Sequence, residues 1–230
     1  MLRLDEIMIV QGGFALQADF SVVPGRKTAV IGPSGAGKST LLGAIGGFLP
    51  LTSGKFWWQD TEITRTAPGH RPIAMLFQDN NLFPHLSIAL NIGLGCRPDL
   101  KLSTEDHARV QRALERVGLA DMSERRPGEL SGGQQSRAAL ARVLVQDRPV
   151  VLLDEPFAAL GPALRHEMLD LVHDLTGETG ATLLMVTHDP QDVRRIADDV
   201  IFVEGGRAHA PQPADALLEN PPPALQAYLG

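Results

Sequence analysis

The 230-residue sequence has one cysteine, Cys96, and no long hydrophobic run. A single cysteine excludes a disulfide within the chain and a CxxC metal site, so we expect Cys96 to be a buried residue without a chemical role. The longest apolar-leaning stretch, LLGAIGGFLPL at 41–51, contains three glycines and a proline. It falls well short of the ~20 residues that a helix needs to cross a bilayer. We therefore predict no membrane span.

Long basic runs and a signal-peptide pattern are also lacking in this sequence. Lys and Arg number 21 against 27 Asp and Glu, which gives a formal net charge of −6. Proteins that bind nucleic acid need clustered cationic side chains to contact the phosphates, so we expect no nucleic-acid partner. The first ten residues, MLRLDEIMIV, lack the basic region, apolar core and cleavage site of a signal peptide. We therefore expect a cytoplasmic protein.

Short apolar runs separated by helical segments predict an α/β fold. Residues 1–25 alternate apolar and polar side chains around Gly12-Gly13, the pattern of an antiparallel hairpin. Residues 103–145 have a helical pattern. Continuous apolar runs suit parallel strands covered on both faces, and the chain length fits one domain with an inserted subdomain. The predicted parallel strands lie within 27–31, 71–77, 150–153, 182–186 and 200–203.

The segment GPSGAGKST at 32–40 fits the phosphate-loop pattern G-x-x-x-x-G-K-[ST], and it lies between a predicted strand and a predicted helix. Glycines let successive backbone N–H groups converge on a phosphate, and the helix N-terminus adds positive potential. Lys38 would reach the β- and γ-phosphate oxygens, and the Ser39 hydroxyl would bind Mg²⁺. The predicted nucleotide-binding residues of this loop are Gly32, Pro33, Ser34, Gly35, Ala36, Gly37, Lys38, Ser39 and Thr40.

A second motif, VVLLDE at 150–155, is an apolar strand that ends in two carboxylates. This arrangement places both carboxylates at the carboxyl edge of the sheet, where open α/β folds bind their ligands. Asp154 would hold Mg²⁺, directly or through water, and Glu155 would accept a proton from the attacking water as general base. The alternative interpretation is a strand that merely ends in a solvated acidic pair.

Three further motifs give the chain a resemblance to a known family. LSGGQ occurs at 130–134, Gln78 follows the run RPIAMLF, and His188 follows TLLMVT. With the phosphate loop and LLDE, these motifs stand in the order typical of ATP-binding cassette (ABC) ATPases, which the sequence resembles over almost its whole length. By itself LSGGQ is only a helix-cap pattern, and a histidine after a strand is commonly a surface or capping residue.

The resemblance implies a P-loop NTPase ABC-type core, in which a mixed sheet has parallel core strands and an N-terminal antiparallel β subdomain. Residues 1–78 and 146–230 would form this core, and residues 79–145 would form an inserted α-helical subdomain, all within the single domain 1–230. It also implies ATP and Mg²⁺ as cofactors. The metal ligands would be Ser39, Gln78 and Asp154, and the catalytic residues would be Glu155, His188 and Gln78.

The resemblance also explains why a second phosphate-binding motif is present. In this family LSGGQ lies far from the phosphate loop of its own chain and faces that of a second copy, so that two ATP molecules lie between the copies. Ser131, Gly132, Gly133 and Gln134 would thus contact the ATP held by Lys38 of the other copy, at the start of a helix predicted over 134–145. His188 would contact the γ-phosphate and orient Glu155 and water.

The chain departs from the family pattern at two positions. Gln11 stands where an aromatic residue usually stacks on adenine, and Phe14 is a candidate substitute. Gly161 stands where an aspartate usually ends the loop after the carboxylates, which would alter communication between the copies. Trp57-Trp58 is an alternative adenine platform, but adjacent strand residues point to opposite faces, so we expect both to serve packing.

The stretches MLFQDNNLFPHLSIALNIGLG, GELSGGQ, LLDEPFAALGPALRHEML and TLLMVTHD look most like the ATP-binding subunits of thiamine importers. This resemblance implies a homodimer that hydrolyses ATP to drive uptake through a membrane permease, with a periplasmic solute-binding protein as an indirect partner. The dimer would lie on the cytoplasmic face of the bacterial inner membrane, and residues 79–90, with Leu82, Phe83 and Pro84, would contact the permease. The alternatives are an importer subunit for iron, polyamine or sulfate, an ABC ATPase outside transport, and a nucleotide-binding regulator that scarcely hydrolyses ATP.

Overall fold

The computed structural model describes residues 1–229, which form a mixture of strands and helices. The strands are β1 (Leu2–Gln11), β2 (Phe14–Val22), β3 (Lys27–Ile31), β4 (Ser53–Trp58), β5 (Thr61–Glu62), β6 (Ile73–Leu76), β7 (Val150–Asp154), β8 (Thr182–Val186), β9 (Asp199–Glu204), β10 (Arg207–Ala208) and β11 (Gln212–Pro213). The helices are α1 (Lys38–Gly46), α2 (Ile88–Cys96), α3 (Thr104–Arg116), α4 (Gly132–Leu144), α5 (Pro162–Thr179), α6 (Pro190–Ile196), α7 (Ala214–Glu219) and α8 (Pro223–Leu229).

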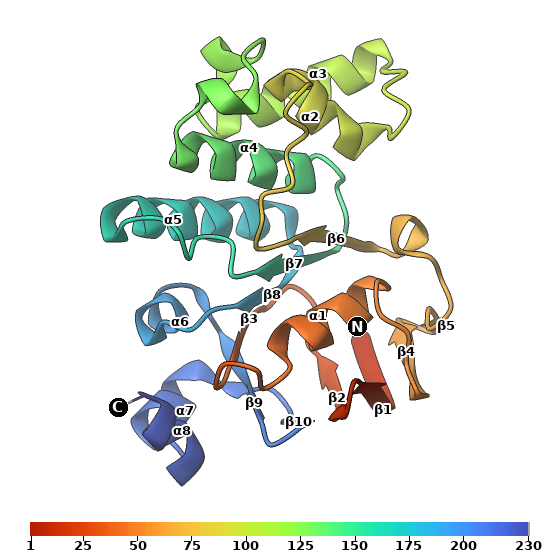
Figure 1. The fold of residues 1–230 in the computed structure, drawn as a ribbon, viewed down its shortest axis with the longest axis vertical. Coiled ribbons are helices and arrows are strands. Elements are labelled where there is room, and N and C mark those ends of the chain that lie inside the picture. The colour runs from red at the N-terminus through yellow and green to blue at the C-terminus, as the bar shows by residue number, and fades with distance from the viewer. Residues whose placement is uncertain (230) are drawn as a thin grey trace.

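The strands form one mixed sheet in the order β5-β4-β1-β2-β10-β9-β3-β8-β7-β6, with β11 paired to β9 (Figure 1). Strands β9, β3, β8, β7 and β6 are parallel, whereas β2, β1, β4 and β5 are antiparallel. The predicted hairpin is confirmed, because β1 and β2 pair around Gly12 and Gly13, whose positive φ values of 54° and 86° suit a two-residue turn. Strand β10 joins the halves by pairing parallel to β2 and antiparallel to β9.

Alternate residues of the parallel strands face two separate apolar cores. Val150 and Leu152 of β7 pack with α1, whereas Val151 and Leu153 pack with α4 and α5. Figure 1 shows α1 on one side of β6, β7 and β8, and α4 and α5 on the other. Because helices cover both faces, every residue of β7 is buried, which explains the continuous apolar run in its sequence.

Helices α2, α3 and α4 form a layer beyond α5, at the top of Figure 1. They share an apolar core that includes Ile92, Leu114 and Ala138. Helix α4 also packs against the sheet, because Leu140 and Val143 belong to the core shared with β7 and α5. The structure places no strand between residues 79 and 145. Helix α4 is therefore the element through which this layer contacts the sheet.

The single cysteine and the lack of a long hydrophobic run can both be examined in the structure. Cys96 is the last residue of α2 and is half-buried at the edge of the helical-layer core, where burial raises the pKa of its thiol. It is therefore less buried than expected. Through residue 229, none of the helices combines the length and hydrophobicity needed to cross a bilayer.

Candidate nucleotide-binding and hydrolysis site

The loop between β3 and α1 is held open by glycine at two positions where a side chain does not fit. A β-carbon on Gly32 would lie 2.0 Å from the carbonyl oxygen of Val203, and Gly32 has a φ of 148°. A β-carbon on Gly37 would lie 2.6 Å from Cζ of Phe14, and Gly37 caps α1 in the left-handed conformation. The loop therefore brings backbone N–H groups to the start of α1 with no side chain in the way.

This loop lines a cavity of about 870 Å³. The cavity collects residues from the β1–β2 turn, from the phosphate loop and from the segments that follow β6, β7 and β8. Strands β6, β7, β3 and β8 are parallel, so their carboxyl ends meet at one edge of the sheet, as predicted for Asp154 and Glu155. The lining residues are Gln11, Phe14, Gly32, Ser34, Gly35, Gly37, Lys38, Ser39, Thr40, Gln78, Glu155 and His188.

Lys38 supplies the positive charge of the cavity. Its side chain is buried, and its Nζ donates hydrogen bonds to the carbonyl oxygens of Gly32 (2.8 Å) and Pro33 (3.0 Å). Burial lowers the pKa of the Lys38 ammonium, and the carboxylates of Glu155 and Asp154 partly oppose this shift. Because the ammonium already lies within the phosphate loop, an incoming phosphate can take the place of these carbonyl partners.

Ser39 and Asp154 form the part of the site that suits a divalent cation. Oγ of Ser39 donates a hydrogen bond of 3.0 Å to Oδ1 of Asp154. Burial raises the pKa of Asp154, while the hydrogen bond from Ser39 acts in the opposite direction. Within residues 1–229 no cluster of three or more His, Cys, Asp or Glu side chains could hold a metal ion alone. A hydroxyl and a carboxylate beside a phosphate loop fit Mg²⁺, which binds few protein oxygens and completes its shell with phosphate and water.

Glu155 and His188 face each other across the mouth of the cavity. Nδ1 of His188 lies 3.5 Å from Oε2 of Glu155, and their side chains are 53% and 25% exposed, respectively. Glu155 has a positive φ of 44°, and its N–H donates to the carbonyl oxygen of Val186 at the end of β8. The backbone thus holds the carboxylate against the segment that carries His188, in reach of both solvent and the cavity.

Behind His188 lies a buried polar network that the sequence did not reveal. Arg165 of α5 donates from Nη2 (2.5 Å) and Nε (3.1 Å) to Oδ2 of Asp192 in α6. Thr187 donates from Oγ1 to the same oxygen (2.5 Å) and accepts from the N–H of Asp189 (3.1 Å). The two residues that flank His188 are therefore tied to α5 and α6.

The LSGGQ segment forms the start of α4, away from the cavity. Ser131 is the N-cap, and Gly132 begins the helix, so the predicted start at 134 was two residues late. Gln134 N–H donates to Oγ of Ser131 (3.3 Å), and Ser131 N–H donates to Oε1 of Gln134 (2.9 Å). A β-carbon on Gly133 would lie 2.3 Å from Cδ2 of Leu164 in α5. The close approach of α5 therefore favours glycine at position 133.

Within the described chain, the structure does not bring LSGGQ and the phosphate loop together. Ser131, Gly132, Gly133 and Gln134 are absent from the lining of the cavity that contains Lys38. Figure 1 shows α4 and α1 on opposite sides of the sheet. Ser131 and Gly132 are exposed, so this helix start is open to a partner. One copy of the chain therefore has the phosphate loop, the carboxylates and His188 in one place, and the LSGGQ segment in another.

The departures from the family pattern can also be placed. Gln11 and Phe14 both line the cavity, and the Phe14 ring contacts the phosphate loop at Gly37. Trp57 lies near Arg3 and Lys55, and Trp58 packs against the main core, so both serve packing as expected. Gly161 is the N-cap of α5 and offers no side-chain hydrogen bond.

Comparison with known proteins identifies the family. Residues 16–158 match the model of a family described as ABC transporter. The chain belongs to the ABC transporter family. It is 59% identical to the thiamine import ATP-binding protein ThiQ of Cereibacter sphaeroides and 59% identical to that of Ruegeria sp., in each case over all of both chains. It is 46% identical to the ThiQ of Brucella suis over 100% of this chain and 95% of that protein.

Solved ABC cassettes have the same fold. An ATP-binding cassette in its ADP conformation is 28% identical, with a TM-score of 0.88 over 100% of this chain and 98% of that one. A dimeric cassette in a post-hydrolysis state, bound to ADP and Pi, is 27% identical, with a TM-score of 0.80 over 93% and 99%. The predicted ABC-type fold is confirmed, and as a member of this family the chain is an ATP-binding ATP hydrolase.

Proposed function

We propose that this ABC ATPase powers the import of thiamine through a membrane permease, and that it works as a head-to-tail homodimer. The observation that carries the proposal is the 59% identity, over the full length of both chains, to proteins named for thiamine import. The cargo itself does not touch this subunit, because a permease and a periplasmic solute-binding protein would bind it. The chain's own contribution is ATP hydrolysis and the movement that it drives.

Hydrolysis is assigned to the cavity beside the phosphate loop. Lys38 and the N–H groups of residues 32–40 would bind the β- and γ-phosphates of ATP. Mg²⁺ would be held by Ser39, Asp154 and Gln78, and when bound it neutralises charge on the phosphate oxygens. Glu155 would take a proton from the attacking water. His188, 3.5 Å from the Glu155 carboxylate, would orient both that carboxylate and the water.

The second copy would complete each site. The start of α4, where Ser131 and Gly132 are exposed, would contact the γ-phosphate bound to Lys38 of the other copy, with Gly133 and Gln134 as further contacts. A helix N-terminus carries partial positive charge and free N–H groups, which suits an anion. The placement of LSGGQ outside the cavity of its own chain supports this pairing, as does the 27% identity to a dimeric cassette. ATP would then hold the dimer closed, and hydrolysis would open it.

The permease would dock in a groove of about 710 Å³ that lies between β6, α2 and α4. Leu82 and Phe83 line this groove, and the Phe83 side chain is exposed. Arg142 of α4 donates hydrogen bonds to the carbonyl oxygens of Asn80 (2.9 Å) and Asn81 (2.7 Å), so the segment after Gln78 is fixed to α4. Movement of residues 79–145 as a unit would thus reach the permease, at the cytoplasmic face of the inner membrane.

Uptake of labelled thiamine tests the proposal. In a strain that lacks the gene, the wild-type chain should restore uptake, and the Glu155→Gln variant, which keeps the groove intact, should not. Uptake of labelled sulfate, iron and a polyamine provides the comparison. Restored uptake of one of these solutes, with no restored thiamine uptake, would reassign the cargo and leave the ATPase role in place.

A further inference from the structure

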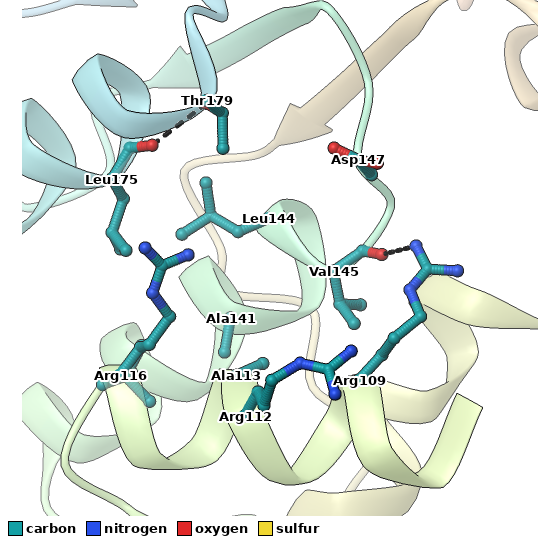
Figure 2. A pocket seen from close by; sticks show the side chains of 11 residues that line it. Arg109, Arg112, Ala113, Arg116, Ala141, Leu144, Val145, Asp147, Leu175 and Thr179 are labelled. Carbon is teal, nitrogen blue, oxygen red and sulfur yellow. Dashed lines mark hydrogen bonds between the residues drawn. The ribbon is translucent and has the colours of Figure 1, made fainter. Parts of the chain in front are cut away.

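A second cavity, of about 230 Å³, is lined by residues of α3, α4 and α5 and shares no lining residue with the cavity beside the phosphate loop. Figure 2 shows Arg109, Arg112 and Arg116 on the face of α3 that lines the cavity, with Arg116 pointing toward Leu175 and Arg109 toward Val145. The cavity is smaller than the ~300–1,000 Å³ of sites for drug-sized ligands, so it suits a small molecule. The lining residues are Arg109, Arg112, Ala113, Arg116, Val117, Ala141, Leu144, Val145, Asp147, Leu175 and Thr179.

One wall of this cavity is cationic. Arg109 donates from Nη2 to the carbonyl oxygen of Val145 (2.6 Å), and Arg116 forms an ion pair with Glu178. Arg112 is exposed, and none of the hydrogen bonds or ion pairs within residues 1–229 involves its guanidinium group. These three arginines give one face of α3 a local positive charge, although the net charge of the chain is −6. The guanidinium N–H groups of Arg112 are available to hydrogen-bond a ligand.

The floor of the cavity is apolar. Val117, Ala141 and Leu175 are buried, and Leu144 is a further apolar residue of the lining. Figure 2 places the Asp147 carboxylate at the edge opposite α3, so a negative group is favoured only on the arginine side. An apolar floor with one cationic wall fits a molecule that has a single anionic group on a compact apolar body.

The position of the cavity couples such a ligand to the ATPase cycle. Arg112 belongs to the helical layer, whereas Leu175 belongs to α5, which packs on the sheet. The last turn of α4 separates this cavity from the groove proposed for the permease. Leu144 and Val145 line the cavity, whereas Arg142 and Gln146 line the groove. A molecule seated between α3 and α5 would hold the helical layer in one position relative to the sheet.

We propose that this cavity is an inhibitory site for a small organic anion, a carboxylate or phosphate on a compact apolar body. The anionic group binds Arg112, with help from Arg116, and the apolar body covers Leu144 and Leu175. Bound ligand restrains the helical layer and slows ATP turnover without entering the ATP site. The inference is independent of the cargo, because it concerns a face of the protein that the proposed permease contact and the phosphate loop leave open.

Benzoate is a suitable probe, because it has a carboxylate on a compact ring and no phosphate that would bind Lys38. Acetate provides the charge without the ring, and benzyl alcohol the ring without the charge. ATP turnover of the full chain is measured against the concentration of each probe, and methyl NMR of Leu144, Val145 and Leu175 reports where the probe binds. Arg112→Ala removes the proposed ligand contact, and Arg65→Ala removes one exposed cationic charge far from this cavity.

We expect benzoate to shift these methyl signals and to lower kcat with little change in KM for ATP, whereas acetate and benzyl alcohol have much weaker effects. Arg112→Ala should raise the half-inhibitory concentration about tenfold, because a charge-assisted hydrogen bond is lost, and Arg65→Ala should leave it unchanged. Equal inhibition of the wild type and Arg112→Ala would overturn the proposal. So would inhibition that is competitive with ATP, or binding at these methyl groups that leaves turnover unchanged.

Discussion

Nδ1 of His188 lies 3.5 Å from Oε2 of Glu155, although the two residues follow different strands, β8 and β7. The pairing depends on the parallel register of these strands, in which Asp154 is opposite Val186. It places a carboxylate and an imidazole at one mouth of the cavity that also contains Lys38. This geometry supports a division of roles in which Glu155 is the base and His188 positions it.

Glu155→Gln should lower kcat by about 10²–10⁴-fold, because the amide keeps the shape of the side chain but does not accept the proton. ATP binding should remain, since Lys38 and the phosphate loop are unchanged. Steady-state hydrolysis and equilibrium binding of labelled ATP separate the two effects, and size-exclusion chromatography with ATP should show an accumulated dimer. Hydrolysis at the wild-type rate would exclude Glu155 as the base, and turnover that is already negligible in the wild type would favour a regulatory role.

Lys38→Ala should abolish tight ATP binding. The side chain is buried among carbonyl oxygens of the phosphate loop, and the lining of the cavity includes no other lysine or arginine that could supply this charge. Binding of labelled ATP measures the effect, and Lys27→Ala, which removes a cation at the opposite end of β3, is the control. Retained affinity in Lys38→Ala would argue against this loop as the main phosphate contact.

Breaking the network behind His188 should reduce both stability and turnover. Arg165 and Asp192 have side chains that are 13% and 5% exposed. Arg165→Met would leave the Asp192 carboxylate buried without a cationic partner, with only the Thr187 hydroxyl donating to it, and removal of one member of comparable buried ion pairs costs about 3–5 kcal/mol. Adding Asp192→Asn should restore much of the free energy of unfolding, measured with urea.

The kinetic effect of the same variants tests positioning. Because Thr187 bonds to Asp192 and precedes His188, Arg165→Met should lower kcat more than it raises KM for ATP. A variant with reduced stability but an unchanged kcat at low temperature would assign this network to folding alone.

The stability of the helical layer should depend on pH through Asp106. Hydrogen bonds from the N–H of Ser103, from the Arg97 guanidinium and from the Ser103 hydroxyl lower the pKa of Asp106 to about 2. An unfolded aspartate titrates near ~3.9, so the stabilising effect is complete above that pH and is lost as the pH falls through about 2. Asp106→Asn should therefore lower the urea midpoint at pH 7, and the difference from wild type should shrink below about pH 4.

Asp121→Asn is the matched control for this pH dependence, because it removes an exposed carboxylate from the same layer. Its midpoint should follow that of the wild type at every pH. A difference between Asp106→Asn and wild type that stays constant from pH 7 to pH 3 would mean that the charge of Asp106 is not the cause.

Much of the site could be predicted from the sequence because its chemistry depends on short motifs. The phosphate loop and VVLLDE each fix a local geometry, and parallel strands bring their ends together at one edge. The Arg165–Asp192 contact could not be predicted, because it joins residues of two helices through tertiary packing. The start of α4 was placed two residues late, since Gly132 and Gly133 favour loops by propensity while the Ser131 cap and the close contact with α5 favour a helix.

A crosslink between Ser131 of one copy and the phosphate loop of another tests the central claim most directly. Two variants are made in a background of Cys96→Ser and Glu155→Gln. One carries Ser131→Cys, and the other carries Ser34→Cys, in which residue 34 lines the ATP cavity. When they are mixed with ATP and Mg²⁺ under mild oxidation, we predict a disulfide-linked dimer that contains one of each. A chain that carries both cysteines and forms the ATP-dependent disulfide within a single copy, at monomer mass, would contradict the account.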